Sequence, residues 1–267
     1  MGNITVLESR DADVRAHIAA GKLDLAGAQV GDSIAVNGVC LTATSFADGG
    51  FWVDISGETL ARTTFGEIRV GSKVNLEQSL TPTTRLGGHL VSGHVDGIGT
   101  VVSCWDQGRS LRFVIQAPST LAKYIAKKGS ICVDGVSLTV NQVNDACAAH
   151  GFASVGRSRH PASGDTCASM HGVGGMMPEV TFDLNIVPHT LQETTLSEWV
   201  AGSRVNLEVD ILARYLERLL LGESAAQPTP PPVASGILPL ATLVHPCTSQ
   251  GAGITHGFLV EHGFIKA

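Results

Sequence analysis

The sequence is poor in aromatic and basic residues, and this scarcity limits the partners that the chain can have. Aromatic side chains make up 5 % of the 267 residues, and 18 Lys and Arg stand against 24 Asp and Glu, for a formal net charge of −6. A nucleic-acid-binding surface needs clustered Lys and Arg, commonly interleaved with aromatic rings, and the sequence has no such cluster. The composition therefore predicts no nucleic-acid partner and favours a small-molecule ligand.

Long hydrophobic runs and paired cysteines are also absent. The longest apolar stretch near the C-terminus, ILPLATLV at 237–244, is far shorter than the ~20 residues that span a bilayer, and no signal-peptide pattern opens the sequence. The six cysteines show no CxxC spacing, and a chain of this size needs no disulfide bonds to fold. We expect a cytoplasmic protein with free thiols and no membrane partner.

The sequence does contain an internal repeat. The segment NGVCLT at 37–42 returns as DGVSLT at 134–139, an offset of 97 residues. Further along, ETLARTTFGEIRVGSKVNLE at 58–77 returns as HTLQETTLSEWVAGSRVNLE at 189–208, an offset of 131. A unit of about a hundred residues is longer than the ~20–50 residues of a solenoid repeat, so the pattern predicts a duplicated domain with an insertion in its second copy.

Each copy has the pattern of a small β domain. Short runs of alternating apolar and polar residues, such as FWVDIS and TFDLNIV, are separated by Gly and Asn turns. About six strands per copy without long crossovers predict an all-β fold: two similar six-stranded closed Greek-key barrels, related by a pseudo-twofold axis, plus a C-terminal α-helix. The expected boundaries are 1–86 for the first barrel, 87–210 for the second and 211–222 for the helix.

Three segments break the repeat. Residues 144–181 interrupt a hairpin with a sequence rich in Gly, Ala and Ser, and residues 223–267 begin as a Pro-rich linker and continue without a period. The second copy opens with GGHLVSGHVDGIGTV, which we interpret as a strand, and its counterpart would fall at or before residue 1. We therefore expect the first barrel to lack its first strand, which would leave an unpaired edge.

Five motifs in a fixed order carry a family resemblance. VNGVCLT, GGHLVSGHVDGIG, KGSICVDGVSLTV, IVPHTLQETTL and GSRVNLEVDILARYLERL together resemble the riboflavin synthases, over residues 1–222 apart from the insertion. The resemblance implies a transferase for the last step of riboflavin biosynthesis, the dismutation of two 6,7-dimethyl-8-ribityllumazine molecules to riboflavin and 5-amino-6-(D-ribitylamino)uracil. It also implies a homotrimer associated through the C-terminal helix, with no cofactor and no metal.

The same resemblance assigns roles to residues of these motifs. The reaction requires proton transfers and a nucleophilic addition, which suit His, Ser and Cys side chains. The catalytic residues that the resemblance implies are His94, Cys40, Ser33 and Ser137. Each barrel would hold one lumazine, with the binding residues Cys40, Leu41, Thr42, Asp54, Glu58, Thr59, Gly93, His94, Val95, Lys128, Ser137, Leu138, Thr139, Asn185, Ile186, Val187, Thr190, Ser203, Arg204 and Val205. The Cys40/Ser137 difference would let one barrel do chemistry that the other does not.

Other interpretations of the same residues stay open. One alternative is a non-catalytic lumazine- or flavin-binding protein of the same fold, and another is an impaired, truncated copy of the enzyme. Asp210 is either an acid of the site or the N-cap of the following helix, whereas Asp134 is expected to organise the turn before Gly135. The His and Cys residues of the insertion match no compact zinc pattern, so we expect no metal.

Overall fold

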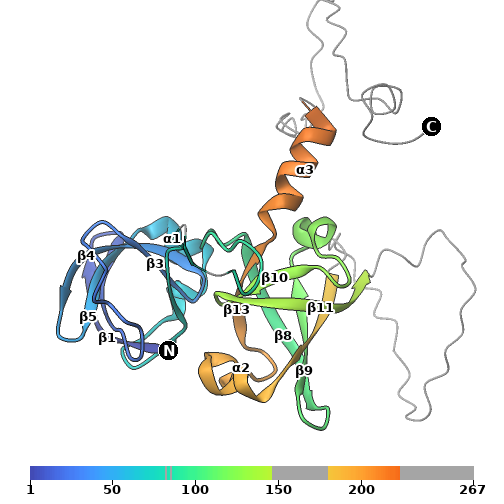
Figure 1. Ribbon diagram of the computed structural model, residues 1–267, viewed down its shortest axis with the longest axis horizontal. Coiled ribbons are helices and arrows are strands. Elements are labelled where there is room, and N and C mark those ends of the chain that lie inside the picture. The colour runs from blue at the N-terminus through green and yellow to red at the C-terminus, as the bar shows by residue number, and fades with distance from the viewer. Residues whose placement is uncertain (82, 85, 146–179, 223–267) are drawn as a thin grey trace, which may run out of the picture. The chain divides into compact units, whose positions relative to one another are not determined.

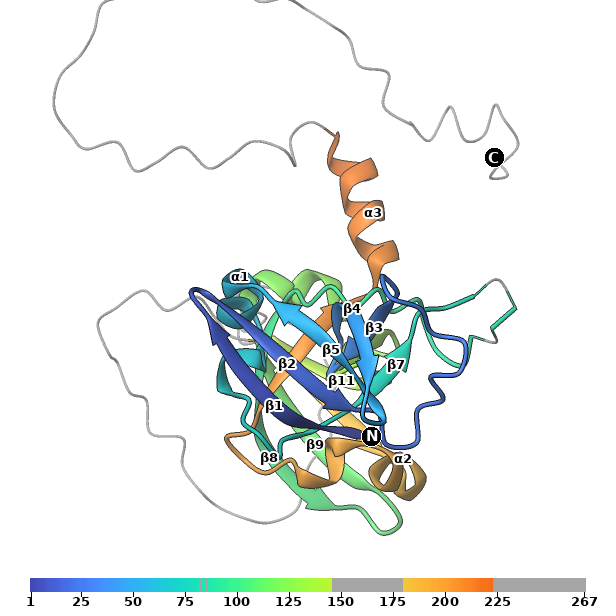
Figure 2. The ribbon, with the colours of Figure 1, turned by 90° about the vertical axis from the view of Figure 1, so that its left-hand side faces the viewer.

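The computed structural model describes residues 1–81, 83–84, 86–145 and 180–222. All of them belong to the first of the chain's two compact units, Met1–Ala225. Their regular structure is mostly β, in two sheets built from the two halves of the repeat (Figure 1, Figure 2). Within the described ranges, no helix is long and apolar enough to cross a membrane.

The first sheet contains the strands of residues 2–78. Its members are β1 Gly2–Arg10, β2 Asp13–Ala19, β3 Ser33–Val36, β4 Val39–Ala47, β5 Gly50–Ile55, β6 Lys73–Val74 and β7 Leu76–Gln78. They lie in the order β6-β1-β2-β5-β4-β3-β7. Only Asn75 separates β6 from β7, so the two edge strands are halves of one extended segment, and the sheet curls round on itself as Figure 1 shows.

The second sheet is a closed barrel with the order β10-β11-β12-β9-β8-β13. Its strands are β8 Gly97–Asp106, β9 Leu111–Ala117, β10 Ser130–Val133, β11 Val136–Asp145, β12 Val180–Ile186 and β13 Arg204–Val209. Each has a counterpart in the first sheet, β13 corresponding to β6 and β7 together. The prediction of two similar six-stranded barrels is therefore confirmed. β11 and β12 pair as far as Asp145 and Val180, and the rest of the predicted insertion, like the tail 223–267, lies outside the described residues.

The prediction that the first barrel lacks its first strand is wrong. Strand β1 pairs with β2 on one side and with β6 on the other, where Gly2 lies opposite Val74. The second barrel repeats this pairing with Gly99 opposite Val205. The sequence suggested a strand over residues 87–101, but only its last part belongs to one, since β8 begins at Gly97 and residues 86–96 contain no strand. The segment before β8 is held instead by hydrogen bonds of Ser92 and Gly93 to Glu208 of the second barrel and of Gly93 to Cys40 of the first.

Each barrel has its own hydrophobic core. Strand residues alternate between the core and the outer face, so that Phe51 and Ile34 are fully buried in the first barrel and Phe113 and Phe182 in the second. Burying a side chain of this size contributes ~1.5–3 kcal/mol. Short helices cover parts of the barrels: α1 Gly57–Arg62 and η1 Thr64–Glu67 in the first, and η2 Ser119–Tyr124, α2 Pro188–Glu193 and η4 Thr195–Glu198 in the second.

The two copies of the repeated hairpin turn meet each other. Asn37 and Gly38 have φ values of 45° and 74°, and Asp134 and Gly135 have 46° and 81°. Positive φ at both central residues is the geometry of a type I′ turn, which Asn-Gly and Asp-Gly favour. A Cβ on Gly38 would lie 2.7 Å from the nitrogen of Gly135, and one on Gly135 would lie 2.8 Å from the nitrogen of Gly38. The glycines are therefore needed twice, for the turn and for the contact.

Reciprocal hydrogen bonds surround this contact. The side chain of Asn75 donates to the carbonyl of Asp134 at 2.9 Å, and the equivalent Asn206 donates to the carbonyl of Asn37 at 2.9 Å. Asn75 Oδ1 accepts from the nitrogen of Thr195 at 2.8 Å, and Asn206 Oδ1 accepts from the nitrogen of Thr64 at 2.8 Å. These pairs follow the offsets of 97 and 131, so the predicted pseudo-twofold relation holds at the level of single bonds.

Ion pairs repeat the same symmetry at the periphery of the interface. Lys73 of the first barrel pairs with Glu198 of the second, and the equivalent Arg204 of the second pairs with Glu67 of the first. All four side chains are about half exposed, so each pair contributes only ~0–1 kcal/mol. Because each pair joins one barrel to the other, the two pairs favour one relative orientation of the barrels.

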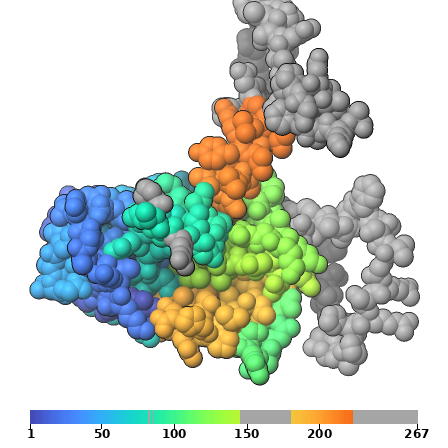
Figure 3. All heavy atoms as spheres, in the orientation of Figure 1, coloured from blue at the N-terminus to red at the C-terminus, as the bar shows by residue number. Residues whose placement is uncertain are grey.

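Helix α3, Ile211–Leu221, follows the second barrel directly. Asp210 is its N-cap, because Asp210 Oδ1 accepts a hydrogen bond from the nitrogen of Leu212 at 3.0 Å. Glu217 ties the helix to the barrel through Lys123 and Tyr124. Figure 3 shows the outer turns of the helix, in orange, standing clear of the other described residues.

Candidate functional site

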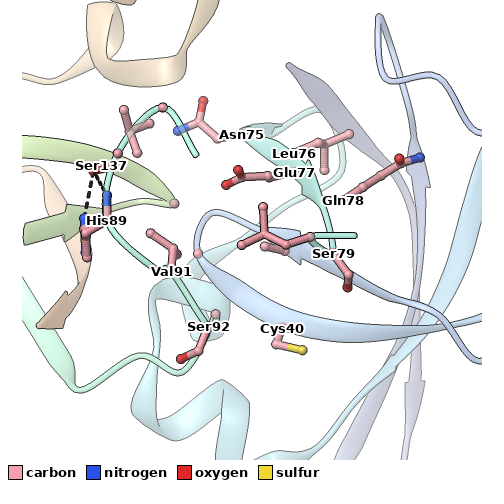
Figure 4. Close-up of a pocket in the computed structure, with 18 of the residues that line it drawn as sticks. Cys40, Asn75, Leu76, Glu77, Gln78, Ser79, His89, Val91, Ser92 and Ser137 are labelled. Atoms are coloured by element: carbon pink, nitrogen blue, oxygen red, sulfur yellow. Dashed lines mark hydrogen bonds between the residues drawn. The ribbon is translucent and has the colours of Figure 1, made fainter. Parts of the chain in front are cut away.

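A cavity of about 600 Å³ lies where the two barrels meet. Clefts of this size hold small organic ligands. Its walls come from β3, β4 and β7 of the first barrel, Thr84 with the segment 86–93, and the beginning of β11 in the second (Figure 4). The polar side chains in its lining are Ser33, Cys40, Asn75, Glu77, Gln78, Ser79, Thr84, His89, Ser92, Ser137, Glu193 and Thr194.

The first barrel supplies Ser33 and Cys40 from the outer faces of paired strands. Ser33 begins β3, whose next residue, Ile34, is buried in the core, and Cys40 in β4 lies between the buried Val39 and Leu41. Strand alternation therefore turns both polar side chains away from the core and toward the cavity. Cys40 is partly buried and lines the cavity.

The second barrel supplies Ser137, which bonds to His89. His89 Nδ1 lies 2.7 Å from Ser137 Oγ, as the dashed line in Figure 4 shows. Burial lowers the pKa of His89 from its ordinary value, although the charges of Asp210 and Glu208 oppose the shift. His89 Nε2 is buried and has no hydrogen-bond partner among the described residues. The arrangement gives a neutral imidazole that is oriented by Ser137 and keeps its second nitrogen for a ligand.

Glu208 anchors Ser92 and Gly93, which also line the cavity. Its carboxylate accepts hydrogen bonds from the nitrogen and the hydroxyl of Ser92, both at 2.7 Å, and from the nitrogen of Gly93 at 3.0 Å. The carbonyl of Gly93 in turn accepts from the nitrogen of Cys40 at 2.7 Å. Glu77, the counterpart of Glu208 in the first barrel, faces the cavity, and its pKa is raised by burial and by the negative charge of Glu208.

The cavity brings together four of the residues predicted for the site. Ser33, Cys40, Gly93 and Ser137 line it. His94, which follows Gly93 in the chain, does not line the cavity, and its side chain is exposed.

The other predicted binding residues lie outside the cavity, in two groups. Leu41, Ile186 and Val205 are buried in the barrel cores, so their side chains face away from solvent. The remainder are at least partly exposed on the barrel surfaces: Thr42, Asp54, Glu58, Thr59, Val95, Lys128, Leu138, Thr139, Asn185, Val187, Thr190, Ser203 and Arg204.

Sequence reasoning missed His89, Glu77 and Glu208. His89 stands in GGHLVSGH, five positions before His94, and nothing in the local pattern says which histidine faces the pocket. The two glutamates each end a copy of the repeated VNLE, and this repetition was the sequence feature that could have indicated them as site residues. The described residues include no group of three or more His, Cys, Asp and Glu that could hold a metal, and the histidines of the insertion lie outside those residues.

Residues 1–79, 92–158 and 166–210 match the lumazine binding domain, so the two barrels are a duplicated domain of that class. The chain belongs to the riboflavin synthase family. It is 42 % identical to riboflavin synthase of Photobacterium phosphoreum, over 83 % of this chain and 86 % of that protein. Riboflavin synthase of Bacillus subtilis is 36 % identical over 72 % of this chain and 73 % of its own length.

Solved structures share the fold. The crystal structure of LumP complexed with riboflavin has a TM-score of 0.59 and 25 % identity, covering 78 % of this chain and 94 % of that one. LumP complexed with 6,7-dimethyl-8-(1'-D-ribityl) lumazine gives a TM-score of 0.58 at 24 % identity, with the same coverage. The second likeness concerns the fold alone.

Proposed function

We propose that this chain catalyses the dismutation of two 6,7-dimethyl-8-ribityllumazine molecules to riboflavin and 5-amino-6-(D-ribitylamino)uracil. A four-carbon unit passes from one molecule to the other, and the atoms of two substrates balance those of the two products. The reaction therefore needs no oxidant, reductant or other co-reactant. Membership of the riboflavin synthase family supports this activity.

The observation that carries the proposal is the reciprocal twofold construction of the two barrels. A reaction between two copies of one substrate requires two similar binding surfaces in a defined relation, because orientation of the reactants removes much of the entropic barrier. Each barrel presents the predicted binding groups at equivalent positions, on exposed or partly exposed residues. The equivalent pairs are Thr42 and Thr139, Asp54 and Asn185, and Thr59 and Thr190.

The polar groups of the cavity suit the steps of the reaction. A neutral His89 can accept or return the proton that leaves the acidic methyl group of one lumazine. Cys40 and Ser33 are placed to add to, or to hydrogen-bond, the ring of the acceptor. The exposed His94 is assigned to the same chemistry. Lys128 and the predicted strand residues around it are assigned to binding of the substrate.

We also assign the chain to a homotrimer in the cytoplasm, associated through helix α3. Leu219 and Leu220 are 78 % and 82 % exposed, and Leu212, Tyr215 and Leu216 are more than half exposed beside them. Contiguous apolar surface of this kind marks a protein interface. Sedimentation equilibrium should give three copies for the wild type and for Arg218→Glu, and a smaller assembly for Leu219→Glu. A wild-type monomer would refute the assignment.

Activity is tested by incubating the purified protein with 6,7-dimethyl-8-ribityllumazine and following the absorbance of riboflavin. We expect riboflavin from the wild type and slower formation from Cys40→Ser, with an unchanged melting temperature for that variant. Tight binding of the lumazine without formation of riboflavin would refute the synthase activity and would support the alternative of a non-catalytic binding protein. Neither binding nor product would refute both.

A further inference from the structure

Glu208 is one of the few acidic side chains that the fold buries. It lies in β13 of the second barrel, is 4 % exposed and forms no ion pair among the described residues. Its partners are instead the three donors of Ser92 and Gly93 described above. A buried carboxylate is costly unless such donors satisfy it, and bonds to a charged acceptor are about twice as strong as neutral ones.

Gly93, one of the two residues that Glu208 holds, lies against Cys40 of the other barrel. Gly93 has a φ of +77°, and a Cβ at this position would come within 2.8 Å of Cys40 Cβ. The carbonyl of Gly93 accepts the hydrogen bond of the Cys40 nitrogen at 2.7 Å. Glu208 in the second barrel is therefore linked to Cys40 in the first through the backbone of Gly93, and two bonds to Ser92 hold the neighbouring residue.

The far end of the same segment is fixed as well. Asp96 Oδ2 accepts from the nitrogen of Val209, the residue after Glu208, at 2.8 Å. Asp96 also pairs with Arg214 of α3. Residues 92–96 are thus held at both ends by β13 and the helix that follows it. The second barrel therefore fixes the segment from which Gly93 contacts Cys40 of the first barrel.

We propose that Glu208 is a positioning residue for the reaction, which holds Ser92 and Gly93 so that Gly93 fixes the backbone of Cys40 at the wall of the cavity. The role rests on the proposed function, because Cys40 belongs to the site of that reaction. Glu208 itself does not touch the reacting atoms. Through Gly93, Glu208 of the second barrel fixes the position of Cys40 in the first, so that the cavity wall at Cys40 forms only when both barrels are folded.

Two variants test this link in steps. In Glu208→Gln, the amide oxygen can still accept from Ser92, but the amide nitrogen faces the N–H of Gly93, so Gly93 is released. In Ser92→Ala, only the hydroxyl bond is lost. We expect kcat for riboflavin formation to fall about tenfold or more in Glu208→Gln and about threefold in Ser92→Ala. KM should change less, because the exposed binding residues of both barrels remain in place.

A second measurement does not depend on turnover. Cys40 and Cys104 are alkylated with iodoacetamide, and mass spectrometry of the two peptides gives the rate for each; the exposed Cys104 is the internal reference. Release of Gly93 uncovers Cys40, so its rate relative to Cys104 should rise about tenfold in Glu208→Gln and less in Ser92→Ala. This ratio remains informative even if the wild type forms no riboflavin, in which case the proposed function fails separately.

Asp183→Asn is the matched control. Asp183 is another buried acid of the second barrel, and it accepts from Arg112 at 2.5 Å, with no bond to residues 92–96. Its replacement should lower stability but leave the Cys40 ratio and kcat unchanged. An unchanged Cys40 ratio in a folded Glu208→Gln protein, or an equal change in Asp183→Asn, would overturn the proposal. If Glu208→Gln does not fold, an unchanged ratio and kcat in Ser92→Ala would do so.

Discussion

Asp134 makes the stability of the folded protein depend on pH. Its side chain is 5 % exposed and accepts hydrogen bonds from the nitrogen of Asn206 at 2.8 Å and from Trp199 Nε1 at 3.2 Å, both within the second barrel. Burial raises the pKa of Asp134 from 3.8 to about 7, against the opposing effect of those two donors. The first barrel has no such titrating group, because the position equivalent to Asp134 is Asn37 and the position equivalent to Trp199 is Ile68.

Whether the free energy of unfolding rises or falls with pH depends on how many protons the folded and the unfolded states bind. Between pH 4 and pH 7 the folded protein holds a proton on Asp134 that the unfolded chain has already lost, so folding becomes less favourable as the pH rises through this window. Each unit of pH costs about 1.4 kcal/mol until the folded-state pKa is reached, and nothing further above it. From pH 5 to pH 8 the free energy of unfolding should therefore fall by about 3 kcal/mol through this group, or roughly 6–12 °C in melting temperature.

Thermal unfolding of two variants isolates this effect. Trp199→Phe keeps an aromatic ring against Phe113, which Trp199 meets edge-on at 5.4 Å, and keeps the titration of Asp134. Asp134→Asn combined with Trp199→Phe removes the titrating group without setting an amide N–H against the indole N–H. The double variant should lose the decline of about 3 kcal/mol between pH 5 and pH 8 that Trp199→Phe retains. Parallel pH curves for the two variants would refute the reasoning.

Three further predictions concern the interface and the site. Gly38→Ala places a methyl group 2.7 Å from the nitrogen of Gly135 at positive φ and should cost about 3 kcal/mol in chemical denaturation, whereas Gly27→Ala, with nothing within 4 Å, should be neutral; equal midpoints would contradict the close approach. Because burial lowers the pKa of His89, the acid limb of kcat/KM should lie below pH 6.5, and it should disappear in His89→Gln; a limb that the variant keeps belongs to another group. His94→Ala should slow riboflavin formation without a change in melting temperature, and an unaltered rate would remove His94 from the catalytic residues.

Local sequence was sufficient for the features that depend on near neighbours. Asn37-Gly38 and Asp134-Gly135 specify their turns because only such pairs adopt positive φ twice without strain. Strand alternation in each copy is enough to separate a core face from an outer face, and Asp210 is readable as a helix cap. The repeat itself indicated two equivalent barrels, because one sequence pattern written twice folds twice in the same way.

Tertiary structure decided which distant residues meet. Residues 87–96 were expected to belong to a strand, yet they form none, and Gly93 within them bonds to Glu208 on one side and Cys40 on the other. The same folding places His89 against Ser137 and leaves His94 exposed. A periodic pattern reports the local backbone and the side that is buried. It carries no information about which segment, a hundred residues away, supplies the buried partner.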